Sequence, residues 1–329
     1  MTAIPIACLV TIATLAFPRA ALAAVLDQVA VQTGAAQERG FCRAESAGAG
    51  GYVVERIAGR LHCLSANGTM TVFLATDSGV VAVDAPPPLM EVYLPAVRSV
   101  IPAPVTHLIY SHSHLDHIGG ASRMPPGAVR IAHEETARTL ARRSDPGRPA
   151  PTRTFAVADT LRVGGDILVL RHHGPNHDVG QLLVYAPRER VLVGIDLWNG
   201  SAPWFRMGGG KDVPGYLALH DSLLAYDFDV FVGGHGAATG TRRDIERQRE
   251  YLWDVVAAAD SAVAAVNYAA GVAGVPPAAH PYEKLAKFYA RQAADCARRV
   301  LAHWRGRLPG VEAATPSHCE AMLESRRVD

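Results

Sequence analysis

The sequence predicts an α/β (α+β) fold over residues 51–240, followed by a helical C-terminal extension over residues 241–329. Short apolar runs of strand length recur through the first of these regions, and several of them end at histidine or aspartate. After Gly240 the strand-like alternation stops, and the chain becomes rich in Ala, Arg, Glu and Gln, which favour helices. With 329 residues, the chain is long enough for one large domain or for a core with an extension.

The first 50 residues predict a targeting signal and a leader. Residues 4–17 are apolar, and Ala21-Leu22-Ala23 supplies a small-residue cleavage site, although no Lys or Arg precedes the apolar run. A transmembrane anchor is the alternative, but the run falls short of the roughly 20 residues that a spanning helix needs. We therefore expect a signal peptide at residues 1–23, an N-terminal leader at 24–50, and a periplasmic or secreted protein without a stable membrane anchor after signal removal.

The first half of the region 51–240 predicts antiparallel strands and then alternating helices and strands. The Asn67-Gly68 pair is a hairpin turn signal between the first two strands. Helical spacing ends at Pro102, and a proline-rich connection at residues 145–151 leads to a second, similar half. The expected strands are residues 52–57, 70–75, 79–83, 105–110 and 128–132, and the expected helices are residues 89–101 and 134–143.

The second half predicts further strands, one helix and then the extension. Residues 271–281 contain three prolines and two glycines, so they should join the two helices of the extension into a hairpin. Packing of this hairpin against the core is favoured over a substrate lid or a dimer surface. The expected strands are residues 152–157, 167–170, 181–185, 191–195 and 228–232, and the expected helices are residues 214–226, 241–270 and 282–307.

Charge and cysteine content limit the partners and the compartment. A net charge of +1 indicates no polyanionic partner, so a small-molecule substrate is expected and nucleic acid is not; the oligomeric state stays open. Cys8 would leave with the signal, and the four remaining cysteines allow three pairings. Pairing of neighbours, Cys42 with Cys63 and Cys296 with Cys319, is favoured over buried free thiols and suits an exported protein.

The segment Ser111-His-Ser-His-Leu-Asp-His-Ile-Gly-Gly120 concentrates metal-ligand side chains. It follows an apolar run and places four potential ligands within six positions. His112 and His114 are two residues apart, so their side chains point the same way on an extended segment. Asp116 continues that set, and His117 lies on the other side. A lone HxH pair is often structural, but this cluster suits two adjacent divalent metals, with zinc as the default ion.

Three further candidate ligands follow apolar runs elsewhere in the chain. His177 comes after residues 167–170, Asp196 after residues 191–195, and His235 after residues 228–232. Strand ends that meet at one edge of a sheet fix ligand geometry, while the loops leave access for a substrate.

Taken in order, the HSHLDH run, His177, Asp196 and His235 resemble the metallo-β-lactamase superfamily, metal hydrolases with an αββα sandwich. Asp84, at the end of the strand-like residues 79–83, matches the early aspartate of that family, which supports the ligand loop from behind the metal ligands. The resemblance spans residues 51–240. It implies a first zinc ion bound by His112, His114 and His177, a second bound by Asp116, His117 and His235, and Asp196 as the bridge between the two.

Asp196 makes the ligand set similar to those of lactonase and glyoxalase II-like members, because β-lactamases usually have Cys, Ser or another non-bridging residue there. The Asn176-His177-Asp178 segment and Ile195 depart from the common patterns. The resemblance implies an exported dinuclear zinc hydrolase in which a metal-bridged hydroxide attacks an ester or lactone and Asp116 shuttles the proton. The alternatives are a β-lactam, thioester or phosphodiester hydrolase, a mononuclear iron oxygenase of this fold, and a metal-binding module without turnover.

The loop at residues 198–215 is the candidate for substrate contacts. It carries Trp198, Trp204, Phe205 and Arg206 beside three consecutive glycines, which suggests a mobile apolar wall; an ordinary packed loop is the alternative. His172 and His173 are expected to be mere neighbours of the site; a role in supporting the ligands or as an oxyanion donor is the alternative. The other histidines are expected to be structural: His62, His107, His133, His220, His280, His303 and His318.

Overall fold

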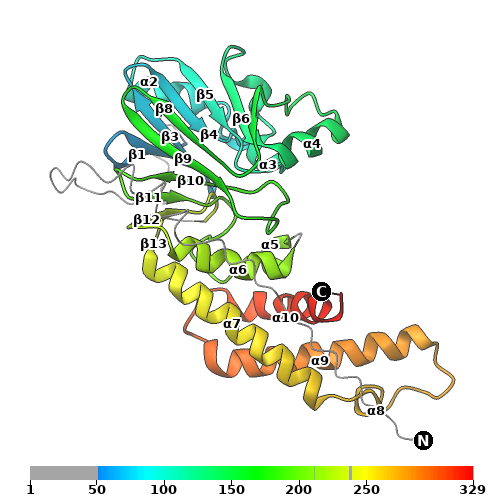
Figure 1. Cartoon of the computed structure of the whole chain (residues 1–329). Helices are drawn as coiled ribbons and strands as arrows, with labels where there is room; N and C mark the ends of the chain where they lie inside the picture. The colour runs from blue at the N-terminus through cyan, green and yellow to red at the C-terminus, as the bar shows by residue number, and fades with distance from the viewer. Residues whose placement is uncertain (1–50, 211, 237–238, 329) are drawn as a thin grey trace, which may run out of the picture. The chain divides into compact units, whose positions relative to one another are not determined.

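The structure is a computed structural model that describes residues 51–210, 212–236 and 239–328 (Figure 1). The predicted signal peptide, the leader and Cys42 lie outside the described residues, so these expectations stay predictions. Among the helices of the described residues, none has the length and apolar character that crossing a membrane requires.

Two β-sheets form the centre of the fold. In the first sheet the strands follow sequence order, antiparallel from β1 to β4 and parallel from β4 to β7. The second sheet has the order β13-β12-β11-β10-β9-β8, with one parallel pair, β11 and β12. The first comprises β1 (Val53–Ala58), β2 (Leu61–Ala66), β3 (Thr69–Thr76), β4 (Gly79–Val83), β5 (Val105–Ile109), β6 (Val129–His133) and β7 (Arg153–Phe155); the second comprises β8 (Ala158–Val163), β9 (Asp166–His172), β10 (Leu182–Ala186), β11 (Val191–Val193), β12 (Val230–Val232) and β13 (Gly240–Thr241).

The two sheets pack face to face, with helices outside them. Strand β3 illustrates the pattern: Val72 and Leu74 join the core between the sheets, whereas Phe73 joins the core under the outer helices. This alternation is the two-residue period of a strand buried on both faces. The helical elements around the sheets are η1 (Pro87–Leu89), α2 (Tyr93–Val100), α3 (Leu115–Ile118), η2 (Ala121–Arg123), α4 (Glu134–Arg143), α5 (Phe205–Gly209) and α6 (Val213–Leu224). The α+β class with C-terminal helices is therefore confirmed.

Three strands were not predicted from the sequence: β2, β8 and the two-residue β13. Asn67 and Gly68 do form a hairpin turn, with φ angles of 52° and 76°, but the turn joins β3 to β2, not to the first strand. Strand β8 follows β7 closely, where one longer strand over residues 152–157 was expected. The outer strand β8 is partly exposed, and its polar residues hide the apolar alternation that marks a buried strand.

The extension contains more than the predicted helical pair. Helix α7 (Arg242–Ala265) begins with a capping box of Thr241 and Asp244, and α8 (Tyr268–Gly271) and α9 (Pro281–Trp304) follow. A further long helix, α10 (Val311–Val328), was not predicted, and it contains Pro316. It packs against α5, α6, α7 and α9 (Figure 1). The predicted Cys296–Cys319 disulfide joins α9 to α10.

Candidate metal centre

Loops at one edge of the two sheets carry the predicted metal ligands, and the structure brings all seven of them together. His112, Asp196 and His235 lie three residues beyond the ends of β5, β11 and β12, respectively. His177 lies in the loop after β9. Rigid strands therefore fix where each ligand loop begins, as the sequence predicted.

The ligand side chains form two groups that share Asp196. Within each group the candidate ligand atoms all lie within 4.8 Å of one another. Asp196 Oδ2 lies 3.2 Å from His177 Nε2 and 3.1 Å from His117 Nε2, one histidine from each group. The first group is His112, His114, His177 and Asp196, and the second is Asp116, His117, Asp196 and His235.

Several buried polar atoms of this centre have no hydrogen-bond partner. They include His112 Nε2 and Asp196 Oδ1. A buried polar atom without a partner costs about 1–3 kcal/mol, so such atoms are rare unless a ligand or ion satisfies them. His112 Nδ1 already lies 2.9 Å from Ser111 Oγ, which leaves Nε2 to face the other ligands. The unsatisfied atoms and the nitrogen-rich donor set both fit divalent metal ions.

The charge balance also favours positive charge at this position. Burial lowers the pKa of His112 well below its usual value, and the neighbouring histidines lower it further. Burial also acts to lower the pKa of His117, but the contacts with Asp196 outweigh it and raise that pKa to about 9. Although burial acts to raise the pKa of Asp196, hydrogen bonds from His117 and His177 hold it well below its usual value. The clustered carboxylates thus stabilise a cation among them.

Asp84 supports the ligand loop, in the place that the resemblance implies. Its carboxylate accepts hydrogen bonds from the Ser111 backbone N–H at 2.7 Å and from Ser111 Oγ at 2.6 Å. It also lies 3.8 Å from His117 Nδ1. Asp84 and Asp196 both have left-handed backbone angles, with φ of 59° and 64°. Such conformations cost about 1–3 kcal/mol each and persist only where the surroundings impose them.

Two features of the site were not predicted. Asp178 Oδ2 lies 3.6 Å from His114 Nε2, and this carboxylate also accepts hydrogen bonds from Ser113 Oγ and the Gly180 N–H. Its proximity to His177 in sequence was the available signal. The backbone carbonyl of Gly208 accepts a hydrogen bond from His177 Nδ1, which leaves His177 Nε2 free to bind a metal. A backbone carbonyl from a distant loop leaves no trace in the sequence.

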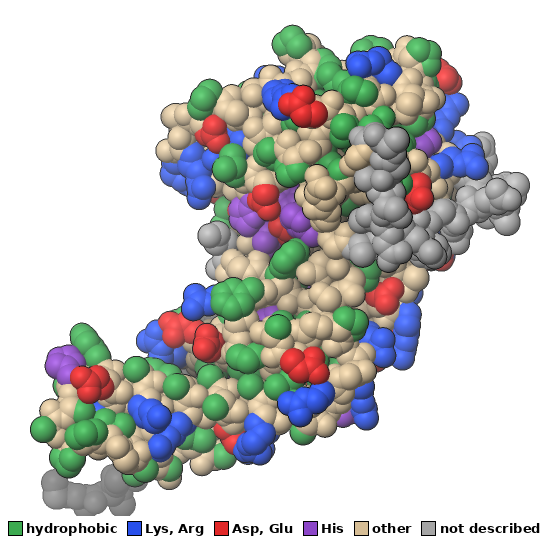
Figure 2. Space-filling view, turned by 180° about the vertical axis from the view of Figure 1, so that it is seen from behind, with side chains coloured by type: hydrophobic (Ala, Val, Ile, Leu, Met, Phe, Trp, Pro, Cys, Tyr) green, Lys and Arg blue, Asp and Glu red, His purple; other side chains and the backbone are tan. Residues whose placement is uncertain are grey.

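Aromatic side chains lie beside the centre. The Trp204 ring is 5.3 Å from the His235 ring, and Phe205 and Leu115 are exposed. Figure 2 shows histidine and acidic side chains gathered in a recess, with apolar side chains close by. Arg206 lies over the Phe205 ring at 5.7 Å. Three of the four predicted substrate-loop residues, Trp204, Phe205 and Arg206, are thus exposed, and Trp204 contacts a predicted metal ligand.

Trp198 is placed differently from the other predicted loop residues. Only 7% of it is exposed, and its ring occupies the space above Gly240, where a Cβ would come within 3.0 Å of ring atoms. Its bulk fills a gap in the core, so Trp198 supports the loop from beneath and offers little surface to a substrate.

The histidine pair next to the third ligand has other partners, as expected. His172 stacks on His133 at 3.8 Å, and its Nδ1 lies 3.0 Å from the Gln181 carbonyl oxygen. His173 Nε2 lies 2.8 Å from the Tyr226 hydroxyl. Both side chains are therefore accounted for by residues outside the ligand set.

Comparison with known proteins agrees with the fold and its site. A family model for the metallo-beta-lactamase superfamily matches residues 67–251, more than half of the chain. The chain is 35% identical over 211 residues to "2,4-dinitroanisole O-demethylase subunit alpha" of Nocardioides sp. (strain JS1661), a match covering 62% of this chain and 63% of the relative. The chain thus spans less than two thirds of that relative's length.

Solved structures with this fold include two metallo-beta-lactamases and a sulfatase. The enzyme from Pontibacter korlensis has 22% identity and a TM-score of 0.52, covering 60% of this chain and 97% of its own. The metallo-beta-lactamase IND-7 has 22% identity and a TM-score of 0.53, and the match covers 62% of this chain and 98% of IND-7. A double mutant of the sec-alkyl sulfatase PisA1 has 17% identity and a TM-score of 0.55, covering 78% and 50%. With the family-model match and the arrangement of its strands, the chain belongs to the metallo-beta-lactamase superfamily.

Proposed function

We propose that this protein is a dinuclear zinc-dependent hydrolase that acts on an ester or lactone. One observation carries the proposal: two groups of ligand side chains share Asp196, whose carboxylate faces histidines of both groups. A mononuclear site would need only one of these groups. Two divalent ions bound there would supply a nucleophile from water at neutral pH and polarise the attacked oxygen.

Asp116 is the proposed proton carrier. Its side chain is 60% exposed, whereas that of Asp196 is 7% exposed, so Asp116 lies where a substrate would enter. Its Oδ2 lies 3.5 Å from the Nε2 atoms of both His117 and His235. The hydrogen bond with His235 lowers the pKa of the Asp116 carboxyl, which keeps the group ionised at neutral pH. The exposed carboxylate is placed to take up the proton of an attacking water. From this position it could pass that proton to the leaving group.

The proposed substrate is apolar near its reacting centre. Trp204 beside His235, with exposed Phe205 and Leu115, supplies apolar surface next to the ligands. Such a wall suits an uncharged ester or lactone, whose carbonyl oxygen needs polarising but whose body needs only apolar contact. Thioesters, phosphodiesters and β-lactams should be weaker substrates in a side-by-side screen.

Elemental analysis of the gently purified protein tests the metal content. We expect close to two zinc ions per chain, and His114→Ala and Asp196→Ala should each lose metal together with activity. One iron ion per chain and no zinc would overturn the dinuclear hydrolase and favour an oxygenase of the same fold.

Hydrolytic O-demethylation of an electron-poor aryl methyl ether is a second candidate. The relative named for O-demethylation of 2,4-dinitroanisole favours it, together with the aromatic wall at the site. Hydrolysis of that ether would consume one water and give 2,4-dinitrophenol and methanol. The assay is anaerobic incubation of the protein with 2,4-dinitroanisole; product that forms only with oxygen present, with formaldehyde in place of methanol, would contradict a hydrolytic route.

We also propose that the protein is exported. The N-terminal apolar run with its small-residue cleavage site supports this, and so does the Cys296–Cys319 disulfide, because disulfides persist in oxidising compartments. Sequencing the N-terminus of protein recovered from a periplasmic or culture fraction tests it. An intact Met1 in a cytosolic fraction would contradict the proposal.

A further inference from the structure

We propose that α10 positions the metal centre: Ser317 and His318 hold the loop at residues 204–208, and that loop in turn orients His177 and Trp204. This inference rests on the proposed function, because it gives Ser317 and His318 their role through the predicted ligands. Both residues lie far from the ligand motifs in sequence, and neither faces the reacting centre directly.

The loop touches one predicted ligand from each group. The Gly208 carbonyl accepts the hydrogen bond from His177 Nδ1, which fixes the orientation of that ring. At the other end of the loop, the Trp204 ring packs edge-on against the His235 ring. A shift of the loop would therefore move a partner of both metal groups at once. Outer partners of this kind tune metal affinity as well as ligand direction.

The loop overlaps the short element α5, but its backbone inside that element is not helical and has a conformation that it would not adopt alone. Arg206, Met207 and Gly208 have φ angles of 53°, 56° and 76°, a run of three left-handed residues. For a residue with a side chain, each costs roughly 1–2 kcal/mol. Such strain persists only where neighbouring structure holds it in place. The contacts that hold this loop are therefore expected to matter for its shape.

Helix α10 supplies two of those contacts. The Arg206 backbone N–H donates a hydrogen bond to Ser317 Oγ at 3.1 Å, while Ser317 Oγ donates to the Ala314 carbonyl. His318 Nε2 lies 2.8 Å from the Trp204 carbonyl oxygen, which can only accept. Nε2 must then carry the proton and donate it to this carbonyl. The two hydrogen bonds hold the loop at Trp204 and at Arg206.

The proton on His318 is fixed by residues behind it. With Nε2 protonated, the neutral ring accepts at Nδ1 from the Tyr251 hydroxyl, 2.7 Å away on α7. Tyr251 in turn accepts from Thr315 Oγ1 at 2.9 Å. The next residue, Cys319, is tied to α9 by the disulfide. The buried His318 side chain thus donates its Nε2 proton to the loop. Its helix, α10, is tied to α7 through Tyr251 and to α9 through the disulfide.

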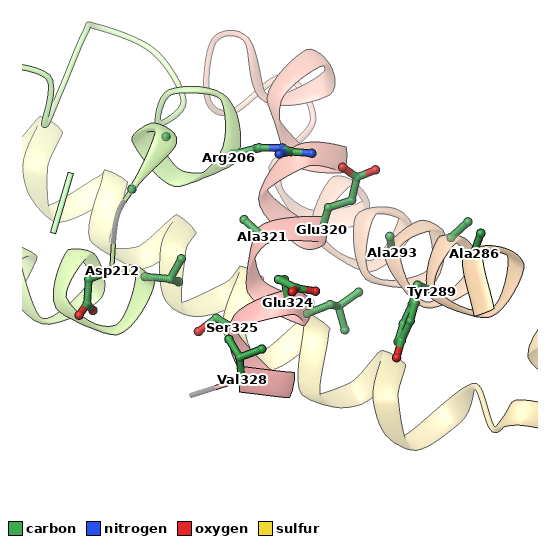
Figure 3. Close-up of a pocket in the computed structure, with 15 residues that line it drawn as sticks. Arg206, Asp212, Ala286, Tyr289, Ala293, Glu320, Ala321, Glu324, Ser325 and Val328 are labelled. Atoms are coloured by element: carbon green, nitrogen blue, oxygen red, sulfur yellow. The ribbon is translucent and has the colours of Figure 1, made fainter. Parts of the chain in front are cut away.

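Both of these hydrogen bonds between the loop and α10 come from one turn of the helix. Beyond it, a cavity of about 800 Å³ lies between the loop and the rest of the helix. Figure 3 shows residues that line this cavity, among them Arg206 and Asp212, Glu320, Ala321 and Glu324 of α10, and Tyr289 of α9. Ser317 and His318 are therefore two points at which α10 can act on the loop through hydrogen bonds.

Cobalt titration of the metal-free protein tests the proposal through visible absorption, without reliance on turnover. Ser317→Ala and His318→Leu should each weaken cobalt binding about tenfold and alter the absorption band of the bound ion. His318→Gln, which keeps an N–H donor for the Trp204 carbonyl, should bind close to wild type. Ser261→Ala is the matched control, because Ser261 makes a similar helix hydrogen bond on α7 and is exposed.

A second control separates positioning from general stability. Val300→Ala empties buried space on α9 and should lower the urea midpoint without changing cobalt affinity. If Val300→Ala weakens cobalt binding as much as His318→Leu does, or if Ser317→Ala and His318→Leu bind like wild type, the positioning role is wrong. A wild-type protein that binds no pair of cobalt ions would instead contradict the proposed function.

Discussion

Two carboxylates, Asp84 and Asp178, lie behind the predicted metal ligands, and each faces a different histidine. Asp84 lies near His117, and Asp178 lies near His114. Each also accepts a hydrogen bond from a serine hydroxyl of the segment at residues 111–120: Asp84 from Ser111 and Asp178 from Ser113. The segment is therefore held from both sides by negative charge, which increases the ability of its imidazoles to bind a cation.

Asp178→Asn should weaken metal binding by about tenfold, because it removes a negative charge 3.6 Å from His114 Nε2 while keeping a similar shape. Competition with a chromogenic chelator measures the affinity. Asp77→Asn is the control, since the Asp77 side chain is 82% exposed and lies in a surface ion pair with Arg60. Equal affinities in the two variants would show that the charge of Asp178 plays no part.

Asp116→Asn should lower kcat by at least about a hundredfold while leaving the metal content near that of the wild type. An amide keeps one oxygen for binding but cannot take up the proton at neutral pH. Elemental analysis and turnover, measured on the same preparation, check both halves. Near-normal turnover would rule out the proton-carrying role, and loss of metal would make Asp116 primarily a ligand.

The sequence could predict which residues meet at the centre, but only part of what orients them. The ligands lie within a few residues of apolar runs, and parallel or adjacent strands carry such ends to one edge. Asp178, the Gly208 carbonyl and His318 could not be identified in this way. Their roles depend on contacts between segments far apart in the chain, and one of them is a backbone atom.

Among the helices and strands, the structure differs from the sequence prediction where polar residues or a proline interrupt the apolar pattern of an element. Strand β8 alternates weakly because one of its faces is exposed, and α10 contains Pro316, which the sequence marks as a break. The long apolar strands and the helix at residues 134–143 were predicted closely, because burial on both faces and a clear helical stripe leave little ambiguity.

The disulfide between α9 and α10 should contribute about 3 kcal/mol to the free energy of unfolding, given its sequence separation of 23 residues. The Cys296→Ser, Cys319→Ser double variant should show this loss in urea titration. Because Cys319 follows His318, the same variant should also bind cobalt more weakly. An unchanged urea midpoint would mean that packing alone fixes α10.

The extension should lose stability in mild acid because of His318. Burial lowers the pKa of this side chain to about 4, so the unfolded chain takes up its proton first as the pH falls below about 6.5. Above about pH 6.5 the buried His318 costs no stability in this way. Towards pH 4 the free energy of unfolding falls by about 3 kcal/mol, because the unfolded chain binds a proton that the folded chain does not. Urea titrations from pH 7 to 4 should show a shallower fall for His318→Gln. Parallel curves would contradict this.

At the scale of the whole molecule, the entrance to the centre combines a buried polar floor with apolar walls. The two sheets supply the ligand loops, and the loop held by α10 supplies Trp204 and Phe205. Helices beyond the sandwich thus shape the entrance as well as the stability of the fold. The substrate that fits best should present its carbonyl to the floor and its apolar body to this wall.

We therefore expect ester or lactone hydrolysis to exceed β-lactam hydrolysis by at least about tenfold in kcat/KM, or roughly 1.4 kcal/mol of transition-state preference. A β-lactam carries a carboxylate that needs firm recognition, and the charged group on this loop, Arg206, lies over Phe205 at 5.7 Å. The resemblance also implies that Asp196 stands where β-lactamases usually have another residue. Parallel kinetics on a phenyl ester, a lactone, a penicillin and a carbapenem measure the preference, with metal-free protein as the control. Efficient cleavage of either β-lactam without esterase or lactonase activity would show that anion recognition, not the apolar wall, governs this site.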